Sequence, residues 1–265
     1  MKLSASNIGW TAEQDEEMYG FLRDSGFSGL EIAPTRIFPE RPYEQIENAG
    51  SYAAELRRKY GLSVPSMQSI LYGVTANIFG GDADYAALTE YLKKAVDFAA
   101  AIDCGNLVFG CPKNRNYSDI NQIGIAVDFF AEIGEYALKK GTVISIEPNP
   151  KIYGTNFLNT TREAVEFIKS VGSGGIKLNV DFGTIVENGE SVNYVAENAV
   201  LVNHIHISEP MLAPIERRED HKILLNEMRR AGYEGYVSIE MKNTGNLDAV
   251  KSAAAYLREI CDEDL

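Results

Sequence analysis

The chain has 265 residues, of which 45% are hydrophobic and 24% are charged. This is the composition of a globular protein with a core of normal size, and it argues against an intrinsically disordered chain. The net charge of −13 at pH 7 disfavours nucleic acid and anionic membrane surfaces as partners, because like charges repel.

The cysteines Cys104, Cys111 and Cys261 are widely spaced and form no CxxC pair. The sequence therefore predicts neither a disulfide framework nor a cysteine-based zinc site. The first residues, MKLSASNIGW, lack the apolar stretch of a signal peptide. No run reaches the roughly 18 apolar residues that a membrane span requires. We therefore expect a cytoplasmic protein with reduced thiols.

Short apolar runs alternate with longer amphipathic stretches from end to end. The short runs predict eight strands, at residues 2–8, 29–33, 63–70, 106–110, 142–147, 176–181, 202–208 and 236–241. Apolar residues recur at three- and four-residue steps between these runs, which is typical of helices. The predicted helices cover residues 12–25, 42–60, 82–101, 122–140, 160–175, 191–199, 219–232 and 246–261.

Eight strands, each followed by a helix, predict an α/β fold of the (β/α)8 TIM-barrel type. We expect residues 1–265 to form it as a single domain, because no linker or charge block divides the chain. The alternative is a doubly wound open sheet, which usually carries a Gly-rich phosphate loop after its first strand. Here the first strand continues into NIGWTAEQ, which contains no GxGxxG.

Four consecutive predicted strands end on a side chain that can bind a metal. The run VISIEPNP (143–150) stops on Glu147, and the matching positions of the next three strands hold Asp181 in LNVDFG, His206 in HIHISEP and Glu240 in VSIEMK. In a TIM barrel the catalytic groups lie at the carboxyl ends of the strands. We therefore expect these four side chains to share one rim of the barrel.

Three clustered carboxylates repel one another in a partly dry cleft, and a divalent cation removes that repulsion. One imidazole with three carboxylates suits Mn²⁺, which we favour, or Co²⁺, Mg²⁺ or Fe²⁺, with Zn²⁺ as a further option. Each group taken alone has another explanation, since an acid at a strand end often caps a helix or pairs with an arginine. The matched positions of all four favour a shared metal site.

The segments SIEPNP, NVDFG, HIHISEP and GYVSIEMK resemble the xylose isomerase-like TIM-barrel superfamily, the sugar isomerases and epimerases related to D-tagatose 3-epimerase. The resemblance covers essentially the whole chain. It implies that Glu147, Asp181, His206 and Glu240 bind one divalent metal. It also implies that Glu147 and Glu240 are catalytic and move protons through a metal-stabilised enediolate. The implied function is a sugar or sugar-derivative isomerase or epimerase of carbohydrate metabolism.

The chain departs from the epimerase pattern at two positions. Those enzymes carry a substrate-binding histidine three residues after the metal aspartate and an arginine six residues after the metal histidine, whereas this chain has Thr184 and Leu212. A different polyol, keto-acid sugar or sugar phosphate therefore fits better than a free ketohexose. The alternative function is a metal-dependent lyase, dehydratase or hydrolase of a modified or oxidised sugar. The DNA-repair endonucleases of the same superfamily bind their metals with many histidines. This chain has three histidines, so a nuclease function is disfavoured.

Five further residues are candidates for substrate binding. Lys113 and Arg115, in FGCPKNRN, could hold a carboxylate or phosphate, or belong to a solvated loop. Gln68 offers an amide to a sugar hydroxyl, while Asn149 and Glu209 lie just beyond Glu147 and His206. The expected partner is a small sugar or sugar derivative, with no nucleic acid and no membrane, and a homo-oligomer is left open.

The sequence leaves the roles of several other residues open. His204 lies one layer deeper than His206, where a hydrogen-bonded core histidine is expected. His221 could reach the pocket or cap a helix. Trp10 could stack on a sugar ring or pack in the core. Glu31 lies inside the barrel or at its rim.

Overall fold

The fold is known from a computed structural model, which describes residues 1–262. Within that range seven parallel strands form one sheet in the order β2-β1-β7-β6-β5-β4-β3. The strands are β1 Lys2–Ser6, β2 Gly29–Glu31, β3 Asn106–Phe109, β4 Val143–Ile146, β5 Ile176–Asp181, β6 Val202–Ile207 and β7 Tyr236–Ile239. Each of them falls inside a predicted strand.

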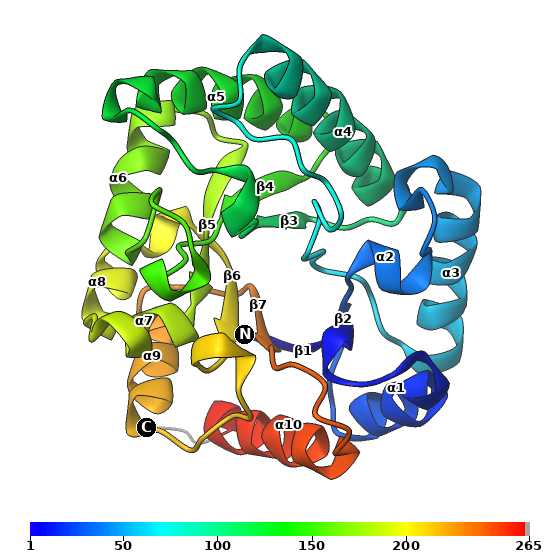
Figure 1. Ribbon diagram of the computed structural model, residues 1–265. Helices are drawn as coiled ribbons and strands as arrows, with labels where there is room; N and C mark the ends of the chain where they lie inside the picture. The colour runs from blue at the N-terminus through cyan, green and yellow to red at the C-terminus, as the bar shows by residue number, and fades with distance from the viewer. Residues whose placement is uncertain (263–265) are drawn as a thin grey trace.

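Helices form an outer ring around the curled sheet (Figure 1). Every predicted helix is present, and the short α2 and α7 are additional. The helices are α1 Asp15–Asp24, α2 Pro34–Ile37, α3 Ile46–Tyr60, α4 Asp82–Ala101, α5 Ile123–Lys139, α6 Thr161–Val171, α7 Phe182–Asn188, α8 Val192–Glu197, α9 Glu219–Arg230 and α10 Leu247–Asp262. None of the helices described is long and apolar enough to cross a membrane.

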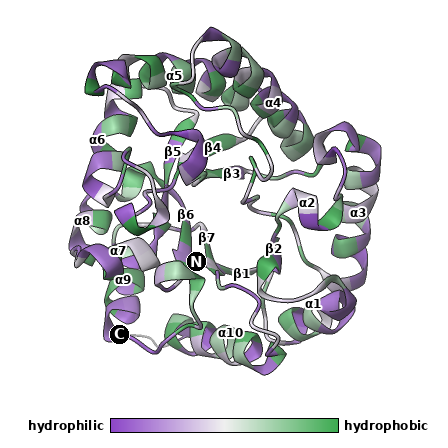
Figure 2. Cartoon of the chain, viewed as in Figure 1, coloured by the Kyte–Doolittle hydropathy of each residue, from purple (hydrophilic) through white to green (hydrophobic). Residues whose placement is uncertain are grey.

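The strands are buried on both faces, because one face meets the barrel interior and the other meets the helices. In β4 the successive residues Ile144, Ser145 and Ile146, whose side chains alternate between the two faces, are all completely buried. The hydropathy colouring follows this arrangement, with hydrophobic strands at the centre and polar residues on the outer faces of the helices (Figure 2). The continuous apolar runs of the sequence therefore correspond to the sheet.

The predicted strand 63–70 does not form as a continuous strand, so the count of eight strands is not confirmed. Ser63 makes an isolated parallel bridge to Gly29 of β2, and Met67 bridges both Ile32 and Leu107. Backbone hydrogen bonds nevertheless tie this segment to both neighbours, since Leu30 N donates to Ser63 O and Val108 N to Met67 O. Pro65 has no N–H to donate, which accounts for the interrupted pairing.

Candidate metal centre

The register of the sheet brings the four predicted ligands to one end of the barrel. Asp181 of β5 is the direct partner of His206 of β6. Glu147 and Glu240 each follow their strand by one residue, after β4 and β7. One ligand atom from each of the four residues lies within 4.8 Å of the others. Strand ends that are distant in sequence thus meet in one cluster.

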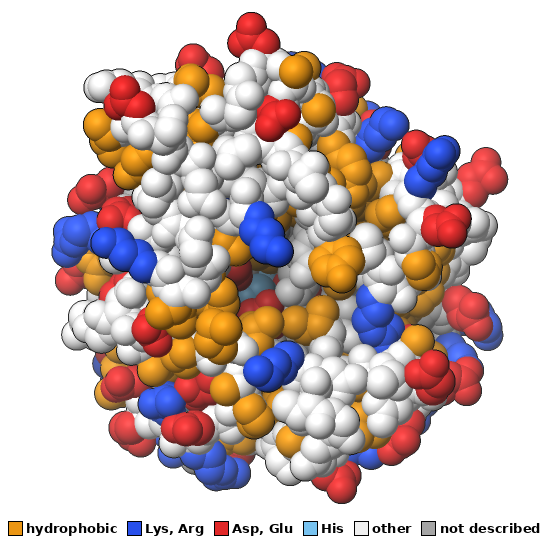
Figure 3. Space-filling view, viewed as in Figure 1, with side chains coloured by type: hydrophobic (Ala, Val, Ile, Leu, Met, Phe, Trp, Pro, Cys, Tyr) orange, Lys and Arg blue, Asp and Glu red, His pale blue; other side chains and the backbone are white. Residues whose placement is uncertain are grey.

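His206 is the centre of this cluster. Its Nδ1 lies 3.1 Å from Glu147 Oε1 and 3.1 Å from Glu240 Oε2. His206 is fully buried, and Asp181 and Glu240 are each 6% exposed. Figure 3 shows a hollow on this face, with acidic and histidine side chains at its floor and hydrophobic side chains around it.

The residues present fit a divalent cation. A cation bound at roughly 2.1 Å from each ligand holds opposite donors about 4.2 Å apart, and the 4.8 Å spread of the cluster is close to that value. Three carboxylates and one imidazole are the ligands that Mn²⁺, Mg²⁺ and related ions use. Both the chemistry of the donors and their spacing therefore fit a divalent cation.

Burial and neighbouring carboxylates raise the pKa values of two acids in the cluster. Burial, together with Glu147 and Asp181, raises the pKa of Glu240 to about 7 against the pull of His206. Burial and Glu147 likewise raise the pKa of Asp181. For His206, burial disfavours the charged ring, but Glu240 and Glu31 outweigh it, and the pKa is raised well above its usual value. The cluster therefore has an excess of negative charge that a bound cation relieves.

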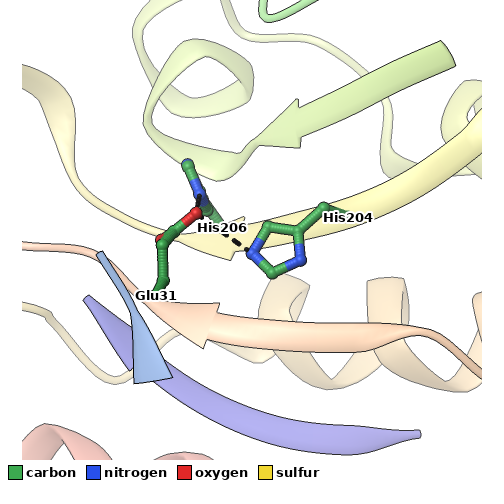
Figure 4. Close-up of side chains that lie close together, drawn as sticks. All are labelled: Glu31, His204 and His206. Carbon is green, nitrogen blue, oxygen red and sulfur yellow. Dashed lines mark hydrogen bonds and ion pairs between the residues drawn. The ribbon is translucent and has the colours of Figure 1, made fainter. Parts of the chain in front are cut away.

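The second nitrogen of His206 is held by Glu31, which reaches over from β2 (Figure 4). His206 Nε2 lies 2.9 Å from Glu31 Oε1, and His204 Nε2 lies 3.4 Å from the same oxygen. Burial opposes the charge on Glu31, but His206 and His204 hold its pKa well below the usual range. An ionised Glu31 accepts a hydrogen bond from the Nε2–H of His206, and Nδ1 faces the ligand cluster.

Four further hydrogen bonds orient Asp181 and Glu147. Thr184 donates to Asp181 Oδ2 through its backbone N at 2.8 Å and through Oγ1 at 2.7 Å, and Ser208 Oγ donates to Oδ1. Asn179 donates to Glu147 Oε1 at 2.8 Å. Neither Asn179 nor Ser208 is among the site residues predicted from the sequence. The signal for Asn179 was a polar residue two positions before Asp181, on the same face of a buried strand.

A cavity of about 180 Å³ lies over the cluster, and Glu147, Asp181 and Glu240 form part of its wall. Gln68 and Asn149, both predicted to bind substrate, also line it. Their amides already have partners, since Gln68 Nε2 donates to Ser6 and Asn149 Nδ2 donates to Pro148 O. The Oδ1 atom of Asn149 is buried and has no hydrogen-bond partner within the described residues.

The backbone around this cavity is unusual. Ser69, Cys111 and Leu212 line it, and all three have positive φ angles, of 54°, 30° and 54°. Residues other than glycine rarely adopt this region, and such strain is concentrated at functional sites. At Gly110 an added Cβ would lie 2.4 Å from Glu147 Oε2. This position must therefore lack a side chain if Glu147 is to keep its place.

The remaining predicted binding residues lie outside the cavity. Lys113 is exposed and lines a neighbouring cavity. Arg115 is fully buried and donates from Nη1 to the backbone oxygen of Glu147 at 2.9 Å, so it supports Glu147 from behind. Glu209 is 3% exposed, and both of its carboxylate oxygens accept hydrogen bonds from Arg218. The structure thus gives Glu209 an arginine partner and does not bring it to the cluster.

The other ambiguous residues also have definite places. His221 is buried on α9 with its ring 4.1 Å from that of Phe182, and Tyr256 Oη lies 3.1 Å from its Nδ1. It neither lines the cavity nor caps the helix. Trp10 is 2% exposed, and its indole donates to Asp15, which fits core packing.

These features define a TIM barrel with a candidate metal centre at the carboxyl ends of four consecutive strands. The sequence model of the xylose isomerase-like TIM barrel family matches residues 20–260, and the chain belongs to this family. A comparison with curated proteins gave no match.

Solved structures share the fold over nearly the whole chain. The 3-keto-D-glucoside 4-epimerase of E. coli is 19% identical with a TM-score of 0.76, covering 98% of this chain and 99% of that chain. The D-allulose 3-epimerase of Methylomonas sp. is 17% identical with a TM-score of 0.76, covering 98% and 96%. An AP endonuclease of family 2 from Brucella melitensis is 18% identical with a TM-score of 0.74, covering 98% and 99%. At these identities the likeness shows the fold.

Proposed function

We propose that this protein is a divalent-metal-dependent epimerase or isomerase of a sugar or sugar derivative, with Mn²⁺ as the favoured metal. The observation that carries the proposal is the position of Glu147 and Glu240, whose carboxylates both lie 3.1 Å from one nitrogen of His206. The solved sugar epimerases of the same fold support it.

A dication held by Glu147, Asp181, His206 and Glu240 would supply Lewis-acid chemistry, because it would polarise neighbouring sugar oxygens and make the adjacent C–H more acidic. Glu147 and Glu240 are the proton-transfer groups in this proposal. One removes the proton from the sugar carbon and leaves an enediolate, and the other returns a proton to the same or the adjacent carbon. Return to the opposite face of the same carbon gives an epimer, and return to the adjacent carbon gives an isomer.

The surrounding residues hold Glu147, Asp181 and His206 in position. Asn179 donates to a carboxylate oxygen of Glu147, and Arg115 donates to its backbone oxygen. Asp181 is fixed by Thr184 and Ser208, and His206 by Glu31. Such support keeps reacting groups within the narrow geometry that proton transfer requires.

The test is proton exchange in D₂O with Mn²⁺ present, followed by NMR across a panel of ketoses, glycosides and sugar acids. We expect deuterium to enter one sugar carbon without loss of any group. Release of water or of a sugar fragment would instead support the lyase, dehydratase or hydrolase alternative. A protein whose thermal unfolding ignores Mn²⁺ would contradict the metal site itself.

A further inference from the structure

The small cavity over the ligand cluster adjoins two larger ones. The first, called here the outer cavity, has a volume of about 710 Å³ and is bordered by Trp10, Thr35, Tyr72 and Asn243, among others. The second measures about 520 Å³ and includes Lys113 in its wall. Ser69 lines all three cavities. The three cavities therefore meet at Ser69, and we call them together the groove.

The sizes of these spaces restrict what they can hold. Pockets for drug-sized ligands measure about 300–1,000 Å³. The cavity over the ligand cluster, called here the reactive cavity, measures about 180 Å³ and is below that range. It suits a single sugar ring. The outer cavity is several times larger and has room for another ring. A substrate that fills both spaces is longer than a monosaccharide.

The charges of the reactive cavity and of the outer cavity favour a neutral occupant. Among the described residues that line the reactive cavity there are three carboxylates and no lysine or arginine. In the outer cavity the one charged residue within positions 1–262 is Arg36, whose guanidinium is paired with Asp15 at 2.6 and 3.0 Å. A phosphate or carboxylate placed there meets no free cation, whereas the hydroxyls of Thr11 and Thr35 and the amide of Asn243 suit a sugar.

Tyr72 is the aromatic side chain that the outer cavity presents to solvent. It is 73% exposed, and within residues 1–262 neither a ring contact nor a side-chain hydrogen bond holds it. An exposed aromatic ring beside a polar cavity provides a flat surface for the C–H face of a sugar. Trp10, by contrast, is buried and fixed by Asp15, so it forms part of the wall behind.

We propose that the substrate of the metal centre is a neutral glycoside whose reacting sugar carries a carbonyl group and whose outer ring lies in the outer cavity and stacks on Tyr72. This inference rests on the proposed function, because it takes the ring in the reactive cavity to be the sugar that exchanges its proton. It replaces the sugar phosphates and keto-acid sugars considered from the sequence with an uncharged substrate of at least two rings.

The test compares disaccharides with their component monosaccharides as ligands of the full-length, Mn²⁺-loaded protein. The probes are cellobiose, maltose, trehalose and lactose against glucose and galactose, measured by calorimetry and ligand-observed NMR. We expect at least one disaccharide to bind more tightly than either of its monosaccharides. Tyr72→Ala should weaken that disaccharide by roughly 3- to 10-fold and leave monosaccharide and Mn²⁺ binding unchanged.

Tyr72→Phe is the matched control, because it keeps the ring and should keep the preference for the disaccharide. Equal binding of one and two rings, an unaffected Tyr72→Ala variant, or no binding of any disaccharide overturns the inference. So does tight binding of glucose 6-phosphate that is lost in Lys113→Ala. Deuterium exchange into a bound monosaccharide tests the proposed function separately, so either can fail while the other stands.

Discussion

The two halves of the barrel rim differ in how regular they are. The ligand half is built from β4 to β7, whose pairings are continuous apart from one register shift in β5 and β6. The groove half is built from β1 to β3 and the segment 63–67, with a three-residue β2 and isolated bridges. After Met67 the chain runs to Gly81 without helix or strand. The regular half holds the groups that need fixed distances, and the irregular half borders the larger cavities.

The largest effect is expected from removing the charge of a proton-transfer residue in the ligand half. Glu147→Gln and Glu240→Gln should each lower turnover by on the order of 10²–10⁴, the usual contribution of a positioned acid or base. Solvent deuterium exchange measures this directly. Glu234→Gln, at an exposed position before β7, is the control and should behave as wild type. A near-normal rate in either glutamine variant would show that the two-glutamate mechanism is wrong.

Glu31 links the two halves of the rim. It belongs to the groove half, and its carboxylate orients His206, a predicted metal ligand of the other half. Glu31→Gln should weaken Mn²⁺ binding by about 10- to 100-fold, as is usual when the partner of a ligating histidine is removed. Calorimetric titration with Mn²⁺ measures the change. Ser238→Ala removes only a 3.2 Å hydrogen bond to the other oxygen of Glu31 and should have a smaller effect. Equal Mn²⁺ affinity in Glu31→Gln and wild type would contradict the orienting role.

Gly110 lies at the boundary of the two halves. In Gly110→Ala the new Cβ displaces the Glu147 carboxylate, which it would otherwise approach to 2.4 Å. We expect the fold to persist, because the atom displaced is the end of a flexible side chain, and Mn²⁺ affinity to fall by roughly 10-fold. Gly105→Ala, at the other end of β3, meets no atom within 4 Å and should bind Mn²⁺ normally. Similar affinities in the two variants would refute the steric argument.

The smallest effect concerns stability alone. Burial, with a contribution from Arg218, lowers the pKa of His221 from 6.5 to about 3. Between these pH values the unfolded chain binds a proton that the folded chain does not. The free energy of unfolding should therefore fall by up to about 1.4 kcal/mol per pH unit as the pH drops from 6.5 towards 3. In His221→Gln this contribution to the pH dependence of the unfolding free energy, measured by urea unfolding at several pH values, should disappear. The same pH dependence in the variant and the wild type would contradict the assignment to His221.

The sequence predicted the ligand half well, because its strands are apolar runs that stop at a charged residue and their order fixes which ends are neighbours. It predicted the groove half less well. The run 63–70 has the composition of a strand, but Pro65 interrupts its hydrogen bonding. The contacts of individual side chains were the hardest feature to predict. The pairing of Glu209 with Arg218 and the burial of Arg115 depend on loop conformations that no local sequence pattern predicts.

The anchoring of Met67 has a consequence for how such a barrel can diversify. Met67 N donates to Asn106 O and Met67 O accepts from Val108 N, so the chain is fastened to β3 just before the stretch that borders the groove. Insertions, deletions or grafted sequences between Ser69 and Gly81 lie after these hydrogen bonds and leave them unchanged. New specificities can thus be acquired there while the framework of the candidate metal centre is inherited intact.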